Sequence, residues 1–154
     1  MNSLPSGLLL FDTCAYIRNI RFGSYEWLTD DDALFLRTVL TVVVAAELYA
    51  GARSSADKKD LDTVCRRHQM LGMLSCPPSD SWVLAGVLLQ RCARLHGDVR
   101  YADHFRGVLI ALETCRHDAT LLTENARDFL RWGRLLRSAG KTLKVFDLRR
   151  LAAR

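Results

Sequence analysis

Acidic and hydroxyl side chains follow apolar, strand-like segments at three places in this chain. They are Asp12 and Thr13 after the run 7–11, Glu47 shortly after the β-branched run 39–44, and Thr123, Asn125 and Asp128 at or after the run 119–123. Parallel strands of an α/β sheet end at one edge, where such proteins place their sites. These side chains, distant in sequence, are therefore expected to be neighbours in the fold.

Oxygen ligands gathered in this way predict a site for Mg²⁺ or Mn²⁺. Carboxylates held close together repel one another unless a cation neutralises them. No convincing set of His or Cys ligands accompanies these acids, which favours a hard ion over zinc. Such an ion promotes phosphodiester cleavage by activating water and stabilising the charge that develops on the phosphate. The pattern is typical of a nuclease.

Several of these residues also have a purely structural interpretation. Asp12 is as well suited to cap a helix beginning near Thr13 as to bind a metal. The acids at 30–32 match the positive end of a helix through residues 33–36, which we favour over a metal site. His104, a lone histidine on a helix, is interpreted as a surface or packing residue rather than a general base.

Composition limits the class of protein. The chain has 154 residues, of which 49% are hydrophobic, and this suits one domain with a sizeable core. No apolar run approaches the roughly 18 residues of a membrane span, and no basic region precedes the short apolar stretch near the N-terminus. The five cysteines are odd in number and lack Cys-x-x-Cys spacing, which predicts reduced thiols. We expect a soluble cytoplasmic protein with no membrane partner.

The charge of the chain favours an anionic partner. Its formal net charge is +5, and nucleic acid is the commonest partner of basic proteins. Near the C-terminus the excess lies in Arg127, Arg131, Arg134, Arg137, Arg149, Arg150 and Arg154. For any one of these arginines, a solvated helical face is the simpler explanation.

The order of elements predicts a parallel sheet. Strands are expected at 7–11, 39–44, 119–123 and 142–146, a loop or frayed helix end at 18–25, and helices from 45, at 102–115 and at 126–131. Helical patterns at 58–74 and 79–95, separated by two prolines, predict a helical hairpin over about 58–95 packed on one edge. Strands separated by helices favour right-handed crossovers, and residues 1–154 form a single domain.

Three motifs in this order resemble the PIN-domain family of metal-dependent ribonucleases, especially the VapC-like toxins. They are Leu8-Leu-Leu-Phe-Asp-Thr, then Val42-Val-Val-Ala-Ala-Glu-Leu-Tyr-Ala-Gly-Ala52, and Thr123, Asn125 and Asp128-Phe129. The resemblance implies an α/β, PIN-like three-layer sandwich with a central parallel sheet of four to five strands. It also implies an Mg²⁺-dependent endoribonuclease acting on RNA, a cognate antitoxin and a homodimer.

The resemblance assigns the site as follows. Catalytic roles fall to Asp12, Glu47, Asp103 and Asp128; metal ligation to Asp12, Glu47, Asn125 and Asp128; and supporting roles to Thr13 and Thr123. The family's third acid is missing, because Gly107 stands two residues before Leu109-Ile110-Ala111. Asp103, one helical turn earlier, is a substitute or simply a helix-start acid.

These departures leave two functions open. The chain is either an active endoribonuclease or a weakened PIN-like domain that binds RNA or an antitoxin. Cys14, where the family often has asparagine, is expected to loosen the first loop without abolishing metal binding. A nucleotide-binding α/β protein is disfavoured, since no glycine-rich loop follows the first strand.

Overall fold

Five parallel strands form the centre of the molecule. The structure, a computed structural model, describes residues 4–152. The sheet has the order β3-β2-β1-β4-β5, and every neighbouring pair is parallel. The strands are β1 (Leu9–Phe11), β2 (Thr38–Thr41), β3 (Leu74–Ser75), β4 (Thr120–Thr123) and β5 (Lys144–Asp147). The predicted α/β class and parallel sheet are confirmed.

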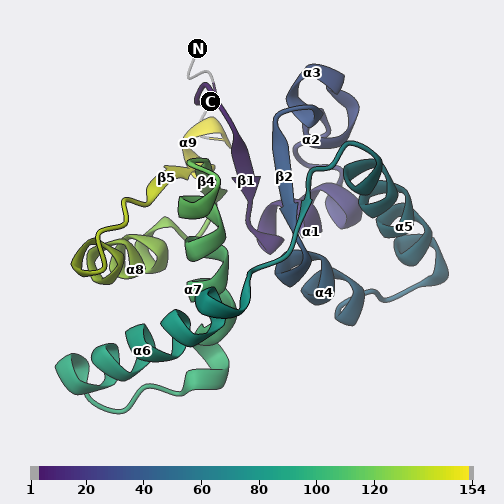
Figure 1. The fold of residues 1–154 in the computed structure, drawn as a ribbon. Coiled ribbons are helices and arrows are strands. Elements are labelled where there is room, and N and C mark those ends of the chain that lie inside the picture. Colours follow the sequence, from purple (N-terminus) through teal and green to yellow (C-terminus); the bar gives the residue numbers. More distant parts are fainter. Residues whose placement is uncertain (1–3, 153–154) are drawn as a thin grey trace.

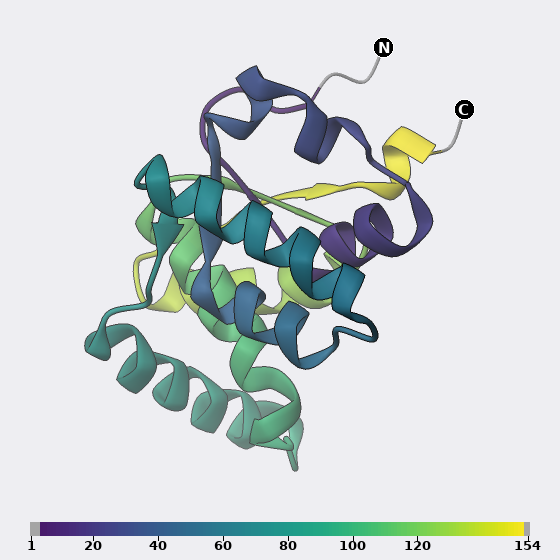
Figure 2. The ribbon, with the colours of Figure 1, turned by 90° about the vertical axis from the view of Figure 1, so that its right-hand side faces the viewer.

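Helices cover both faces of this sheet (Figures 1 and 2). They are α1 (Thr13–Phe22), α2 (Trp27–Asp30), α3 (Asp32–Phe35), α4 (Val42–Ala50), α5 (Ser55–Met70), α6 (Ser79–His96), α7 (Tyr101–Arg116), α8 (Ala126–Ser138) and α9 (Arg149–Ala152). Helices α1, α4 and α5 pack together on one side, and α6, α7 and α8 pack together on the other. The three layers of the expected sandwich are present.

The chain reverses its direction of travel across the sheet between β1 and β4. From β1 the sheet grows through β2 to β3, and the later strands β4 and β5 are added on the opposite side of β1. Loops after β1 and β4 therefore lead to helices on opposite faces and leave a crevice at the carboxyl ends of these strands. Asp12 follows β1 and Thr123 ends β4, so both lie beside this crevice.

The second strand is shorter than its sequence indicates. We predicted strand from 39 to 44, but β2 ends at Thr41 and Val42 begins α4. The Thr41 hydroxyl accepts a hydrogen bond from the Val43 N–H at 3.3 Å and caps the helix. This cap, with burial of Val43 and Val44 in the core, outweighs the β preference of the valines. Glu47 consequently lies in the second turn of α4.

The segment 18–36 also differs from the prediction. We predicted a loop or frayed helix end from residue 18, but helix α1 continues to Phe22. The helix is capped at its C-terminus by Gly23. Gly23 has φ 61°, a left-handed conformation that glycine adopts without steric cost. The acids at 30–32 do start a helix, because the Asp31 carboxylate accepts from the Leu34 N–H at 3.0 Å. Two short helices, α2 and α3, replace the single one expected.

The predicted helical hairpin over 58–95 is wrong. Between α5 and α6 the chain forms β3, which pairs with β2 at the edge of the sheet. Helix α5 packs on α4 and β2, whereas α6 crosses to the other side and packs on α7 (Figure 1). A two-residue strand is too short to show a periodic pattern, so the sequence did not separate the two helices.

A buried polar network holds the end of α7 against β3. Glu113 is fully buried and accepts hydrogen bonds from the Ser75 hydroxyl and, at 2.8 Å, from Arg116 Nε. Burial raises the pKa of Glu113, but the hydrogen bonds donated by Arg116 and Ser75 lower it by a larger amount. The pKa of Glu113 therefore lies below its ordinary value. The network fixes α7, whose other end borders the crevice.

Two further properties concern the chain as a whole. No helix within residues 4–152 has the length and apolar character that crossing a membrane requires. All five cysteines are free thiols, and only Cys92 is fully buried. The C-terminal arginine at 154, counted above in the basic segment, lies outside the described residues.

Candidate functional site

The carboxyl ends of β1 and β4 open into a polar pocket of about 150 Å³. Helices α4, α7 and α8 complete its walls. Its lining comprises Asp12, Glu47, Asp103, His104, Arg106, Gly107, Ile110, Asn125, Asp128, Phe129 and Trp132. Every residue to which the sequence assigned catalysis or metal binding therefore lines one pocket, although these residues span more than a hundred positions of the chain.

Asp12 is both a helix cap and a pocket residue. Its Oδ1 accepts from the Thr13 N–H at 2.8 Å and caps α1, while its Oδ2 accepts from the Thr123 hydroxyl at 2.9 Å. The two interpretations that the sequence left open are compatible. The cap and the hydroxyl together fix the carboxylate at the crevice between β1 and β4.

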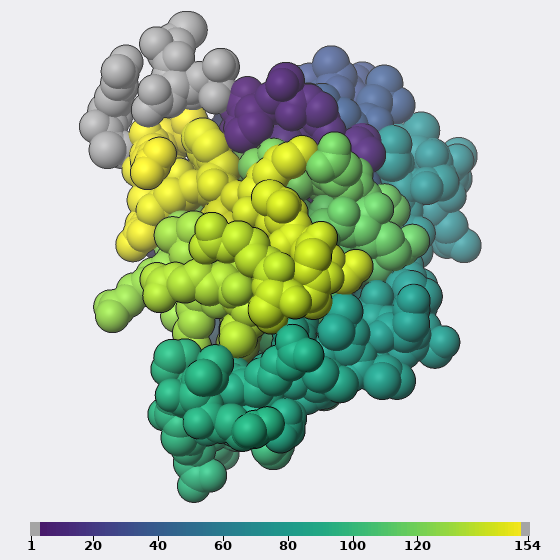
Figure 3. All heavy atoms as spheres, turned by 60° about the vertical axis from the view of Figure 1, so that its left-hand side comes forward, coloured from purple at the N-terminus to yellow at the C-terminus, as the bar shows by residue number. Residues whose placement is uncertain are grey.

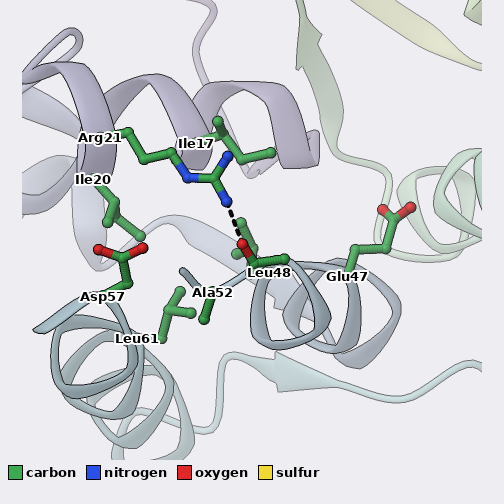
Figure 4. A pocket seen from close by; sticks show the side chains of 9 residues that line it. Ile17, Ile20, Arg21, Glu47, Leu48, Ala52, Asp57 and Leu61 are labelled. Carbon is green, nitrogen blue, oxygen red and sulfur yellow. Dashed lines mark hydrogen bonds between the residues drawn. The ribbon is translucent and has the colours of Figure 1, made fainter. Parts of the chain in front are cut away.

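Glu47 is held between a hydroxyl and a guanidinium. Its Oε2 accepts a hydrogen bond from the Thr13 hydroxyl, and its Oε1 lies 3.0 Å from Arg106 Nε. Figure 4 shows the Glu47 carboxylate turned away from Arg21 and Asp57, which lie in a small apolar recess between α1, α4 and α5. Thr13 thus lies next to both Asp12 and Glu47.

The third motif forms a short hydrogen-bonded chain beside Asp12. Thr123 is fully buried, and its hydroxyl accepts from the Asn125 N–H at 2.9 Å while donating to Asp12. The Asn125 side-chain amide donates to Asp128 Oδ2 at 2.7 Å. Thr123 therefore connects the ends of β1 and β4, and Asn125 holds the carboxylate of Asp128, which lines the pocket.

Cys14 stabilises the first loop rather than loosening it. Its thiol lies 3.4 Å from Asp12 Oδ2 and accepts from the Glu124 N–H at 3.4 Å. Burial, with the nearby charge of Asp12, raises the pKa of Cys14 to about 12. The thiol consequently stays protonated at physiological pH and serves as a neutral donor to Asp12.

Helix α7 supplies a weaker wall. Asp103 reaches the pocket, but its carboxylate is half exposed and lies 3.4 Å from Arg100 Nε. A Cβ atom at Gly107 would lie 3.5 Å from Trp132 Nε1, an ordinary contact distance, so the backbone there accepts a Cβ atom. The His104 ring packs 5.4 Å from the Trp132 ring, which agrees with the packing role predicted for it.

Arg106 is the pocket residue that sequence reasoning missed. Its guanidinium pairs with Glu47, although α4 and α7 are far apart in the chain. The available signal was its position in the sequence. Arg106 directly precedes Gly107, the position at which the sequence resemblance implies the third acid. A cation beside Glu47 supplies part of the positive charge that a metal would otherwise bring.

The pocket fits a hard divalent ion in donor type. Asp12, Glu47, Asp128 and Asn125 offer carboxylate and amide oxygens, which Mg²⁺ and Mn²⁺ prefer. Across residues 4–152, however, no three Asp, Glu, His or Cys side chains are arranged closely enough to hold a metal. The donor chemistry therefore suits the ion, while Gly107, where the sequence resemblance implies a further acid, leaves the pocket wall without a carboxylate at that position.

Comparison with known proteins gives structural relatives alone. No protein-family model matches the chain, and no curated protein matches its sequence. Among solved structures, VapBC from Salmonella typhimurium, a DNA-bound complex, matches with a TM-score of 0.62 and 16% identity over 92% of this chain and 98% of that chain. FitAcB from Neisseria gonorrhoeae matches with a TM-score of 0.61 and 19% identity over 91% and 97% of the two chains.

A third match extends the same result. VapBC2 from Rickettsia felis, bound to a DNA fragment from its promoter, has a TM-score of 0.57 and 19% identity over 91% of this chain and 99% of that chain. The likeness spans nearly the whole length on both sides. The chain therefore shares the fold of these VapBC and FitAcB structures, the PIN-like α/β fold that the sequence resemblance implied.

Proposed function

We propose that this protein is an Mg²⁺- or Mn²⁺-dependent endoribonuclease. The observation that carries the proposal is the convergence of Asp12, Glu47 and Asp128, with Asn125, on one pocket where the chain reverses across the sheet. Carboxylates at this place in an α/β fold, in a chain of net charge +5, suit a metal-assisted reaction on a polyanion.

Each side chain has a distinct task in this proposal. Asp12 and Glu47 hold the ion, and Asp128, oriented by Asn125, completes the acidic wall. When bound, the ion supplies an activated water and charge stabilisation at the phosphate. Thr13 and Thr123 fix the carboxylates by hydrogen bonds, and Arg106 is placed to move from Glu47 to a phosphate oxygen.

The toxin of a toxin–antitoxin pair is the biological role we propose. The solved structures with the same fold are named as VapBC and FitAB complexes, which supports an antitoxin partner for this chain. RNA as substrate follows from the resemblance to PIN-domain ribonucleases and is consistent with the basic charge. A cytoplasmic location and a homodimer belong to the same proposal.

Removal of divalent metal is expected to stop RNA hydrolysis. Purified protein should degrade single-stranded RNA in Mg²⁺ or Mn²⁺, lose this activity in EDTA, and regain it when either ion is returned in excess. The reason is that, without the ion, the acidic pocket repels phosphate. Gel analysis of a labelled RNA measures the effect. Undiminished hydrolysis in EDTA would refute a metal-dependent mechanism.

A second function is favoured by a specific observation. Gly107 leaves the wall of α7 without its acid, and the Arg106 guanidinium already pairs with Glu47. Both features weaken a metal site and suit a PIN-like domain that binds RNA or an antitoxin without cutting. The variant Gly107→Asp separates these two functions, since it restores one feature of a metal site.

A further inference from the structure

A groove lined by arginines lies between α6 and α8. It encloses about 610 Å³ and is lined by Arg91, Arg94, Leu95, His96, Arg131, Arg134, Leu135 and Ser138. Four arginines from two helices thus line the groove, and no carboxylate is among the lining residues. Figure 3 shows the segments that contain α6 and α8 stacked on one face of the molecule.

These arginines lack counterions. Within the described part of the chain, no Asp or Glu oxygen lies within 4.0 Å of the charged atoms of Arg91, Arg94, Arg131 or Arg134. Two of the four donate hydrogen bonds to neutral groups, Arg91 to Ser138 Oγ at 3.2 Å and Arg131 to Cys92 Sγ at 3.0 Å. Four like charges held around a hollow repel one another, and a bound anion would relieve this repulsion.

The groove adjoins the candidate active site through α8. Asp128 and Trp132 on this helix line the pocket, while Arg131 and Arg134 line the groove. Arg131 lies three positions after Asp128, and residues at this spacing are neighbours on a helix surface, so the two surfaces meet along α8. Arg131 marks the junction, because its guanidinium lies 5.1 Å from the centre of the Trp132 ring.

We propose that this arginine groove binds the phosphate backbone of single-stranded RNA and guides the strand to the pocket. The inference rests on the proposed ribonuclease function. An endonuclease must hold its substrate beside the bond that it cuts, and guanidinium groups bind phosphate through paired hydrogen bonds. Leu95 and Leu135 add apolar surface for the ribose and bases.

The test measures RNA binding without cleavage. Fluorescence anisotropy of a labelled uridine-rich RNA in EDTA compares wild type with the double variant Arg94→Glu and Arg134→Glu. We expect binding to weaken about tenfold or more. The matched control is Lys59→Glu with Arg66→Glu, which makes the same charge change on exposed residues of α5, on the other side of the sheet. The control should bind nearly as wild type.

A milder variant guards against misfolding. Arg94→Gln with Arg134→Gln keeps bulk and polarity, and its thermal unfolding should match wild type. Because each lost phosphate contact on a single strand lowers the salt slope by about 0.7, the slope of log K against log salt should fall by about 1.4. An unchanged slope together with wild-type affinity would overturn the proposal.

Other outcomes are equally decisive. If the wild-type protein binds no RNA, the proposal fails. If the groove variants lose binding to a polyglutamate peptide but still bind RNA, the groove binds an acidic protein segment and the proposal also fails. If the groove variants lose RNA while wild type shows no metal-dependent cleavage, the groove is supported and the ribonuclease function falls. If cleavage proceeds with unchanged KM in the groove variants, the ribonuclease stands and the groove proposal is refuted.

Discussion

Asp12→Asn is expected to reduce Mg²⁺-dependent RNA hydrolysis by about a hundredfold or more, since losing a metal-binding charge costs several kcal/mol of transition-state stabilisation. Asparagine is nearly as good a helix cap as aspartate, and its amide oxygen can still accept from Thr13. The variant should therefore fold with nearly wild-type stability. Single-turnover hydrolysis of a labelled RNA, with a thermal unfolding curve, measures both.

Asp31→Asn provides the matched control. Asp31 also caps a helix, through the Leu34 N–H at 3.0 Å, but it is exposed and does not line the pocket. This variant should hydrolyse RNA as wild type does. Equal activity of Asp12→Asn and wild type would contradict the proposed role of Asp12, because no other carboxylate occupies the end of β1.

Gly107→Asp is expected to raise both Mg²⁺ affinity and hydrolysis, each by about tenfold or more. A Cβ atom is accepted at this position, where the nearest atom to it is Trp132 Nε1 at 3.5 Å. Position 107 lines the same pocket as Glu47 and Asp128, so a carboxylate there would supply the acid that the resemblance to PIN-domain ribonucleases leads us to expect. Aspartate is also slightly better than glycine within a helix.

Gly107→Asn separates the charge from the bulk. It adds a side chain of the same size without the negative charge, and we expect little gain in metal affinity by calorimetric titration with Mg²⁺. A gain confined to Gly107→Asp, starting from a nearly inactive wild type, would favour the weakened binding module as the natural function. No gain from either variant would show that position 107 is not the missing part of the site.

The residues of the pocket were predictable because the local sequence places them. A carboxylate directly after a buried run, as at Asp12, is delivered to the carboxyl edge of the sheet whatever the rest of the chain does. The same reasoning correctly placed Thr123 at the end of the strand that became β4 and Asp128 after it. Because parallel strands end at one edge of the sheet, these segments could be predicted to meet without knowing any side-chain contact.

Features that depend on tertiary contacts were not predictable in this way. The Arg106–Glu47 pair joins α4 to α7, and no local pattern shows which arginine meets which acid. Val42 and Val43 read as strand because β-branched residues prefer it, yet the Thr41 cap and the core made them helical. The arginine groove likewise arises only when α6 packs beside α8.

Diffraction from crystals containing Mn²⁺ is the most direct test of the central claim. The anomalous signal locates the ion without reference to activity. We predict a peak in the pocket at about 2.1 Å from carboxylate oxygens of both Asp12 and Glu47, with Arg106 displaced from Glu47. A saturating Mn²⁺ soak that leaves the pocket without a peak, with Arg106 still paired to Glu47, would contradict the account.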